Sequence, residues 1–203
     1  MSRLGLPNCI SLGRILLVPV FVFFLVRQAD SGRVRDRLLA IGVFAVMALS
    51  DWVDGYLARR LRQETALGRI LDPAADKLLV ICAVVLLWRL GVACPTESGD
   101  LHQFRLPGWV VGIAISRDLL VCLGALASRL FAVPVRLQAR TLGKWCTAAQ
   151  LALVLAMLLL PGLPGEAANL PVICWWISSA LAVAAAADYV AVGIRALEAW
   201  SFA

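Results

Sequence analysis

Residues 51–77 read DWVDGYLARRLRQETALGRILDPAADK and place four aspartates, Asp51, Asp54, Asp72 and Asp76, next to strongly apolar segments. The run before them, LLAIGVFAVMALS at residues 38–50, carries no charge. Carboxylates are costly at membrane depth, so acidic side chains in such surroundings indicate a functional site. The rest of the chain is therefore interpreted outward from this stretch.

The composition is that of an integral membrane protein. The 203 residues are 62% hydrophobic and 16% charged, and the mean hydropathy is +0.87, well above that of an ordinary soluble domain. A spanning helix needs roughly 20 mostly apolar residues. The sequence therefore predicts an all-α fold of about six transmembrane helices, at residues 7–27, 37–59, 68–92, 107–131, 141–162 and 170–194. The first segment has no small-residue cleavage site, so we expect it to be retained and not removed as a signal peptide.

The basic residues predict an orientation. The net charge is +6, which in a soluble protein would raise nucleic acid as a partner; here it is explained by the positive-inside rule. With the N-terminus inside, twelve of the 19 Lys and Arg residues fall on the cytoplasmic side. The loop RQADSGRVRDR, residues 27–37, favours the opposite orientation. We expect a multi-pass protein of the cell (inner) membrane with both termini in the cytoplasm.

Cysteine and histidine do not form a recognisable metal site. The six cysteines are spread singly, mostly within apolar runs, and His102 is the single histidine. A zinc site or a disulfide framework is therefore disfavoured, and the cysteines are interpreted as small buried residues.

Helix geometry groups the four aspartates. Residues three, four and seven apart share a helix face, which applies to Asp51, Asp54 and Ala58 and then to Gly68, Asp72 and Asp76. The intervening RRLRQETAL is short enough to return the chain as a helical hairpin. We expect the hairpin to bring the two acidic faces together at the cytoplasmic side.

Clustered carboxylates of this kind need positive charge among them, because they repel one another and lose hydration. Oxygen ligands without nearby imidazole or thiolate favour Mg²⁺ or Mn²⁺. Two such ions about 3.5–4 Å apart would clamp a phosphate or pyrophosphate. Surface ion pairs with nearby basic residues are the structural alternative, and these residues are Arg59, Arg60, Arg62, Arg69 and Lys77.

The remaining residues of the stretch suit a nucleotide ligand. Gly55 and Gly68 leave room for a base or sugar to approach the helices, Ala58 keeps its face small, and Arg59 can pair with a phosphate. Pro73 allows two local structures. Either Asp72 caps the next helix with Pro73 at its first position, or Pro73 lies within a helix already begun.

At these residues the chain resembles the CDP-alcohol phosphatidyltransferases, whose signature is D-x2-D-G-x2-A-R-x8-G-x3-D-x3-D. Every fixed position is filled with the required gaps, by Asp51, Asp54, Gly55, Ala58, Arg59, Gly68, Asp72 and Asp76. The resemblance implies a single transmembrane catalytic domain over residues 1–203. It also implies transfer of a phosphatidyl group from CDP-diacylglycerol to an alcohol, with release of CMP.

The resemblance assigns roles to these residues. The four aspartates would hold two divalent ions, and Asp76 would also act as the general base on the acceptor hydroxyl. The CDP group would be bound by Asn8, Asp54, Gly55, Ala58, Arg59 and Gly68. Family members suggest a homodimer.

Other parts of the chain resemble phosphatidylglycerophosphate synthases, which use glycerol-3-phosphate. PNCISLGRILLVP at residues 7–19 fits their first-helix pattern, and GKWCTAAQ at residues 143–150 fits a later motif whose Lys144 follows Arg117 by 27 positions. Three departures, Asp118, Ala125 and Cys146, are more similar to cardiolipin synthases, which accept phosphatidylglycerol. An acceptor-phosphate pocket could be formed by Arg117, Arg136, Arg140 and Lys144.

Two hypotheses from other functional classes stay open at this point. A divalent-cation transporter would also carry intramembrane acids, although it would distribute them through the bilayer depth. A non-catalytic membrane scaffold would tolerate neutral substitutions at Asp72 and Asp76. Arg117 and Asp118 could likewise be only a charge pair within a span.

Overall fold

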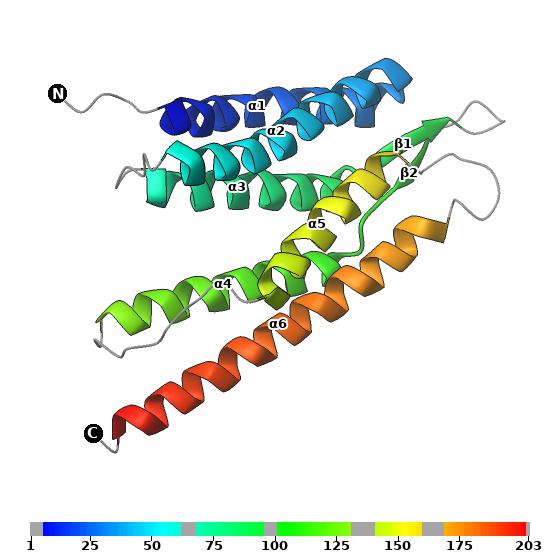
Figure 1. The fold of residues 1–203 in the computed structure, drawn as a ribbon. Helices are drawn as coiled ribbons and strands as arrows, with labels where there is room; N and C mark the ends of the chain where they lie inside the picture. The colour runs from blue at the N-terminus through cyan, green and yellow to red at the C-terminus, as the bar shows by residue number, and fades with distance from the viewer. Residues whose placement is uncertain (1–5, 62–67, 96–100, 131–140, 160–168, 202–203) are drawn as a thin grey trace. The chain divides into compact units, whose positions relative to one another are not determined.

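The computed structural model describes the backbone of residues 6–61, 68–95, 101–130, 141–159 and 169–201, and the side chains of residues 13–50, 77–94, 101–124, 141–159 and 169–195. Within these ranges the elements follow in the order α1 (Leu6–Ser31), α2 (Val34–Leu61), α3 (Gly68–Arg89), β1 (Val92–Pro95), β2 (Leu101–Phe104), α4 (Gly108–Leu130), α5 (Thr141–Leu159) and α6 (Leu170–Ser201) (Figure 1). Each segment predicted to be helical corresponds to one of these helices, and α1, α2 and α6 extend beyond the predicted bounds. The mostly helical fold is confirmed.

The chain divides into two compact units. The first contains residues 1–106 and 154–168, and the second contains residues 107–153 and 169–203. The prediction of one domain over residues 1–203 stays a prediction.

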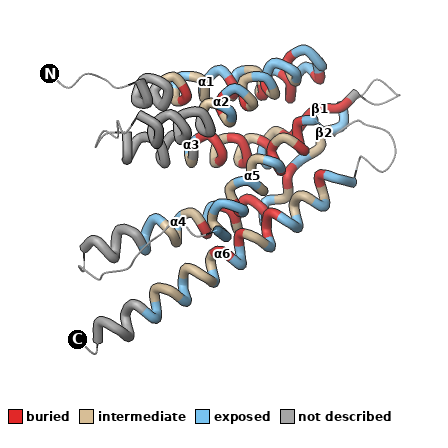
Figure 2. Tube along the Cα trace, viewed as in Figure 1, coloured by how far each residue is buried: buried red, intermediate tan, exposed pale blue. Residues whose placement is uncertain are grey.

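The first unit is organised around α1, which packs against both α2 and α3. Along α1 and α2 the buried residues recur about every three or four positions, as a helix with one packed face requires. Figure 2 shows buried positions recurring along α1 and α2. They include Phe21 and Leu25 of α1 and Phe44 of α2. The rings of Phe21 and Phe44 lie 5.7 Å apart between centroids. Aromatic and aliphatic side chains therefore fix the register of α1 on α2.

Large apolar side chains are also exposed on the helices, as expected where lipid replaces water. Leu16, Leu49 and Ile177, for example, are 67%, 63% and 52% exposed. Two helical stretches among the described residues are long and apolar enough to cross a membrane, Thr141–Leu159 and Leu170–Arg195. These observations fit a membrane protein.

The connection between α3 and α4 contains structure that the sequence did not indicate. β1 and β2 form an antiparallel hairpin in which Val92 pairs with Phe104 and Pro95 with Leu101. The hairpin is fixed to α1 by side-chain amides, because Gln28 donates to the Ala93 carbonyl at 2.7 Å and Gln103 donates to the Ala29 carbonyl at 2.8 Å. These bonds satisfy backbone groups that an isolated hairpin would expose.

Arg37, near the start of α2, caps the C-terminal end of α5. Its guanidinium donates to the carbonyl of Leu158 and, at 2.7 Å, to the carbonyl of Leu159. A cation at a helix C-terminus is favourable because the last carbonyls lack partners within the helix. Arg37 also acts electrostatically on Cys94: burial raises the pKa of the Cys94 thiol, and the nearby guanidinium opposes that shift.

Gly91 is required by the turn into β1. Its φ is 76°, and a Cβ there would lie 2.8 Å from the Phe104 carbonyl oxygen. We expect Gly91→Ala to lower the free energy of unfolding by about 1–3 kcal/mol, measured by thermal unfolding in detergent. The matched control is Gly42→Ala within α2, where a Cβ meets nothing within 4 Å and helix propensity improves by up to about 1 kcal/mol. Equal midpoints for Gly91→Ala and the wild type would contradict this account.

The second unit is held together by α4, α6 and the first part of α5. Cys146 of α5 is fully buried in a cluster with Ala182 and Ala185 of α6, and Ile113 of α4 packs against this cluster. At the start of α4, the Trp109 ring lies 5.1 Å from the Trp176 ring between centroids. Small residues at the cluster allow the helices to approach closely, as is common in membrane bundles.

Candidate active site

The signature lies on two helices whose backbones are as predicted. Asp51, Asp54 and Ala58 fall in the last turns of α2, and Gly68, Asp72 and Asp76 fall in the first turns of α3. The spacing therefore places each set along one helix face. The side chains at positions 51–61 and 68–76 lie outside the described residues, so the convergence of the four carboxylates stays a prediction.

The backbone brings the relevant helix ends to one place. Figure 1 shows the start of α1, the end of α2 and the start of α3 at the same end of the first unit. Asn8 belongs to the first turn of α1, and the six residues between α2 and α3 limit their separation to about 25 Å. The predicted metal and CDP residues thus occupy one end of a three-helix group.

The start of α3 resolves the alternatives for Pro73. Because α3 begins at Gly68, Pro73 is the sixth residue of a helix already begun and not its first. Proline has no N–H, so the carbonyl of residue 69, four positions earlier, receives no helical hydrogen bond from it. The capping alternative for Asp72 is therefore wrong, and Asp72 lies within the helix.

The donor set suits hard divalent cations. The signature offers carboxylate oxygens only, which is the chemistry that Mg²⁺ and Mn²⁺ prefer. Among the residues whose side chains the structure describes, no group of three or more His, Cys, Asp and Glu residues could hold a metal ion. The assignment of a metal to the signature aspartates stays a prediction.

Arg14 joins the candidate residues. It lies fewer than two turns after Asn8 in α1, and only 1% of its surface is exposed. A buried cation in an apolar helix generally marks a polar interior or a site. A signal for Arg14 is visible in the sequence, since it is the one charge in an apolar stretch from Leu4 to Val26, but its burial is known only from the structure.

In the second unit, Arg117 of α4 is a buried cation with a specific partner. Its Nη1 donates to the Asp118 carboxylate at 2.6 Å, and the two side chains are 7% and 9% exposed. Adjacent helix residues do not normally face each other, so the Arg117 side chain must bend toward its neighbour. A Cβ at Gly143 of α5 would lie 3.4 Å from Arg117 Nη2. Arg117 therefore lies against the GKWC motif of α5.

The other predicted acceptor residues are only partly placed. Lys144 follows Gly143 directly and is exposed, whereas Arg136 and Arg140 lie outside the described residues. Cys146, which stands where the related motif has a second lysine, is buried among alanines. An ammonium at that position would be desolvated, so position 146 contributes packing and no charge to an acceptor pocket.

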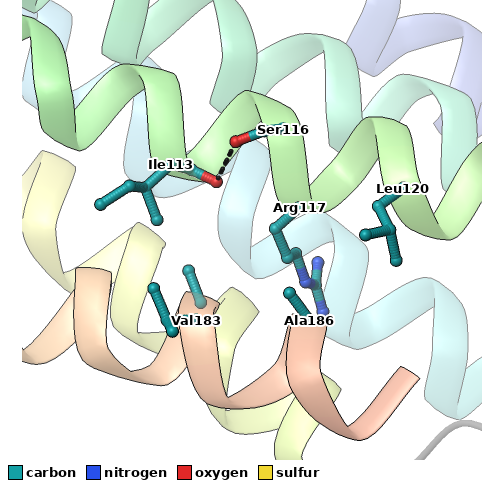
Figure 3. Close-up of a pocket in the computed structure, with 7 residues that line it drawn as sticks. Ile113, Ser116, Arg117, Leu120, Val183 and Ala186 are labelled. Carbon is teal, nitrogen blue, oxygen red and sulfur yellow. Dashed lines mark hydrogen bonds between the residues drawn. The ribbon is translucent and has the colours of Figure 1, made fainter. Parts of the chain in front are cut away.

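Arg117 also borders a cavity of about 220 Å³ between α4 and α6. Figure 3 shows its guanidinium extending from α4 toward Ala186 of α6. The remaining lining is largely apolar and comprises Ile113, Ser116, Leu120, Ala182, Val183 and Ala186. The Ser116 hydroxyl donates to carbonyls of its own helix, those of Gly112 and Ile113. Among these lining residues the guanidinium is thus the group that can bind an anion.

Comparison with known proteins agrees with the signature. A model of the CDP-alcohol phosphatidyltransferase family matches residues 4–189. The chain belongs to this family. Membership excludes the transporter and scaffold readings as the main function, because the family is one of transferases.

Individual relatives within the family carry two names. A Bacillus subtilis protein named CDP-diacylglycerol–glycerol-3-phosphate 3-phosphatidyltransferase is 34% identical over 204 residues, covering 96% of this chain and 97% of its own. A Pseudomonas fluorescens protein of the same name is 40% identical over 118 residues, covering 58% and 53%. A Streptomyces coelicolor cardiolipin synthase (CMP-forming) is 34% identical over 176 residues, covering 85% and 73%. Both acceptor types therefore occur among proteins similar to this chain.

Proposed function

We propose that the protein transfers the phosphatidyl group of CDP-diacylglycerol to glycerol-3-phosphate and releases CMP. The observation that carries this proposal is the complete eight-residue signature on the end of α2 and the start of α3. The name of the Bacillus subtilis relative, which aligns along nearly the whole of both chains, supports the acceptor.

The signature residues have two separate binding roles in the proposed reaction. Asp51, Asp54, Asp72 and Asp76 would hold two Mg²⁺ or Mn²⁺ ions, which supply positive charge against the pyrophosphate. The nucleotide side of the donor would contact Asn8, Asp54, Gly55, Ala58, Arg59 and Gly68. These assignments place the donor phosphates between α2 and α3.

The proposed transfer step assigns the role of general base to one carboxylate. Asp76 accepts the proton of the acceptor hydroxyl as its oxygen attacks the β-phosphorus of CDP-diacylglycerol. The new P–O bond forms as the bond from that phosphorus to the CMP oxygen breaks, and CMP leaves with the electron pair. Arg117, Arg136, Arg140 and Lys144 would bind the acceptor phosphate.

The membrane topology and the location of the active site are part of the same proposal. We assign six membrane spans to α1–α6, a cell (inner) membrane location and an active site facing the cytoplasm, supported by the distribution of Lys and Arg. A homodimer is supported by the family resemblance.

A second acceptor is favoured by observations in the second unit. Asp118 and the buried Cys146 replace residues of the glycerol-3-phosphate enzymes, and the cavity at Arg117 has an apolar wall. Phosphatidylglycerol, giving cardiolipin and CMP, is therefore the alternative, as in the name of the Streptomyces coelicolor relative.

An acceptor panel tests the proposal. Purified protein with CDP-diacylglycerol and Mg²⁺ is expected to release CMP when glycerol-3-phosphate is added and to remain silent without an acceptor. Turnover with phosphatidylglycerol and none with glycerol-3-phosphate would move the assignment to cardiolipin synthase. Divalent-metal flux into liposomes without CDP-lipid, together with no CMP release, would contradict the enzyme.

A further inference from the structure

Helix α5 carries a buried polar side chain at its middle. Gln150 is the tenth of the nineteen residues of α5, and only 1% of its surface is exposed. Its Nε2 is buried and has no hydrogen-bond partner among the described residues. Because α5 is apolar and long enough to cross a membrane, neither bulk water nor lipid can satisfy this amide. The amide therefore needs a partner from the protein interior.

Helix α6 carries a second buried polar atom without a partner. Ser179 is 6% exposed, and its Oγ forms no hydrogen bond within the part of the chain that the structure describes. A serine within a helix often donates to the carbonyl four residues earlier, as the Ser116 hydroxyl does to the Gly112 carbonyl. The Ser179 hydroxyl makes no such bond to its own helix, so it is available to a group outside α6.

The two polar atoms belong to the same level of the second unit. Cys146 of α5 is buried in a cluster with Ala182 and Ala185 of α6. Gln150 lies about one turn after Cys146, on the same face of α5. Ser179 lies about one turn before Ala182, on the same face of α6. Because α6 runs in the opposite direction to the part of α5 in this unit (Figure 1), both steps lead to the same side of the cluster.

A ligand between these two side chains has to be small and uncharged. The cluster beside them is closed, since its three residues are at most 3% exposed. A metal ion needs several oxygen ligands, and the Gln150 amide offers N–H groups that repel a cation. A buried anion needs a cationic partner, and neither Gln150 nor Ser179 carries a charge. Water meets these conditions, and buried waters commonly bind polar groups that are otherwise unsatisfied.

We infer that an ordered water molecule joins α5 to α6 at this level, accepting a hydrogen bond from Gln150 Nε2 and bonding to Ser179 Oγ. The water fixes the rotation of α5 about its own axis. Gly143, which lies beside Arg117, is seven residues before Gln150 and shares its helix face. The inference goes beyond the proposed function and holds whichever acceptor the enzyme uses.

Single substitutions test the water by the sign of their effect on the unfolding temperature of the full-length protein in detergent. Ser179→Ala and Gln150→Met nearly keep the size of each side chain and remove one partner of the water. Each should lower the unfolding temperature by about 2–6 °C, because the remaining polar group loses its bridged arrangement. If the two groups were simply unpaired, each substitution would delete a buried unsatisfied atom and raise the unfolding temperature. A rise in both variants would overturn the inference.

The double variant measures the coupling between the two side chains. Gln150→Met together with Ser179→Ala removes both partners of the water, so its decrease should be less than half of the sum of the two single decreases. Ser116→Ala is the matched control, because its hydroxyl is satisfied within α4. Combined with Gln150→Met it should give an additive effect. Additive effects of Gln150→Met and Ser179→Ala would contradict a shared ligand.

An experimental structure of the wild-type protein separates a bound water from a direct bond and requires no variant. Density for a water within about 3.2 Å of both Gln150 Nε2 and Ser179 Oγ is the expected result. A direct bond between these two atoms, or well-ordered side chains with no density between them, would overturn the inference.

Discussion

Asp76→Asn is expected to reduce CMP release from CDP-diacylglycerol by at least about a thousandfold, because it removes both the proposed general base and one carboxylate of the metal set. Asparagine keeps the size of the side chain, so helix packing should change little. The measurement is initial-rate CMP formation by purified protein at saturating CDP-diacylglycerol and glycerol-3-phosphate.

Asp30→Asn is the matched control for this substitution. Asp30 is an exposed carboxylate in the last turn of α1 and lies outside the signature, so its loss should leave the rate within twofold of the wild type. Asp72→Asn should behave like Asp76→Asn. A signature variant with wild-type turnover would contradict the assigned roles and favour a structural ion pair at these positions.

Removal of divalent metal is expected to abolish turnover completely and reversibly. The four signature carboxylates, converging as we propose, would repel one another without cations among them, and the donor pyrophosphate adds further negative charge. Protein treated with excess EDTA should release no CMP, and either Mg²⁺ or Mn²⁺ should restore the rate. Ca²⁺ is the comparison ion, because its longer bonds and larger coordination number suit a compact site less well.

The unfolding temperature provides a second readout for the metal. Mg²⁺ should raise it in the wild type, by binding only the folded state, and should raise it less in Asp72→Asn. Full activity in excess EDTA would exclude metal-assisted transfer, whatever the effect of the aspartate substitutions.

The positions of the helices could be predicted from the sequence because apolar runs of membrane length are separated by Gly, Pro and charged residues. The start of α3 at Gly68 and of α6 at Leu170 coincide with predicted segment starts. The number of helices that cross the membrane is harder to obtain from composition. Arg14 and Arg117 place charges inside apolar runs, and whether such a charge is buried or at the surface depends on its partners.

The hairpin of β1 and β2 could not be predicted for a related reason. Its strands are only four residues long, and the bonds that fix it join Gln28 to Ala93 and Gln103 to Ala29, pairs that are 65 and 74 residues apart in the chain. Local pattern carries no information about such a partner.

The candidate site was likewise predictable from the sequence only in part. The aspartate signature could be assigned from spacing alone, since eight fixed positions rarely match by chance, and its side-chain geometry stays a prediction. For Arg117 the sequence allowed either a charge pair or a ligand site. The structure shows the pair with Asp118, and a cavity beside the unpaired Nε; the ligand site stays a prediction.

The contact between Arg37 and the end of α5 sets an order for biogenesis. Its carbonyl partners are made 121 and 122 residues after the arginine, which at about 5–20 residues per second corresponds to a delay of roughly 6–24 s during translation. Until then the guanidinium has neither of these two partners. Helix α2 can therefore form early, but it reaches its final environment only after most of the polypeptide has been synthesised.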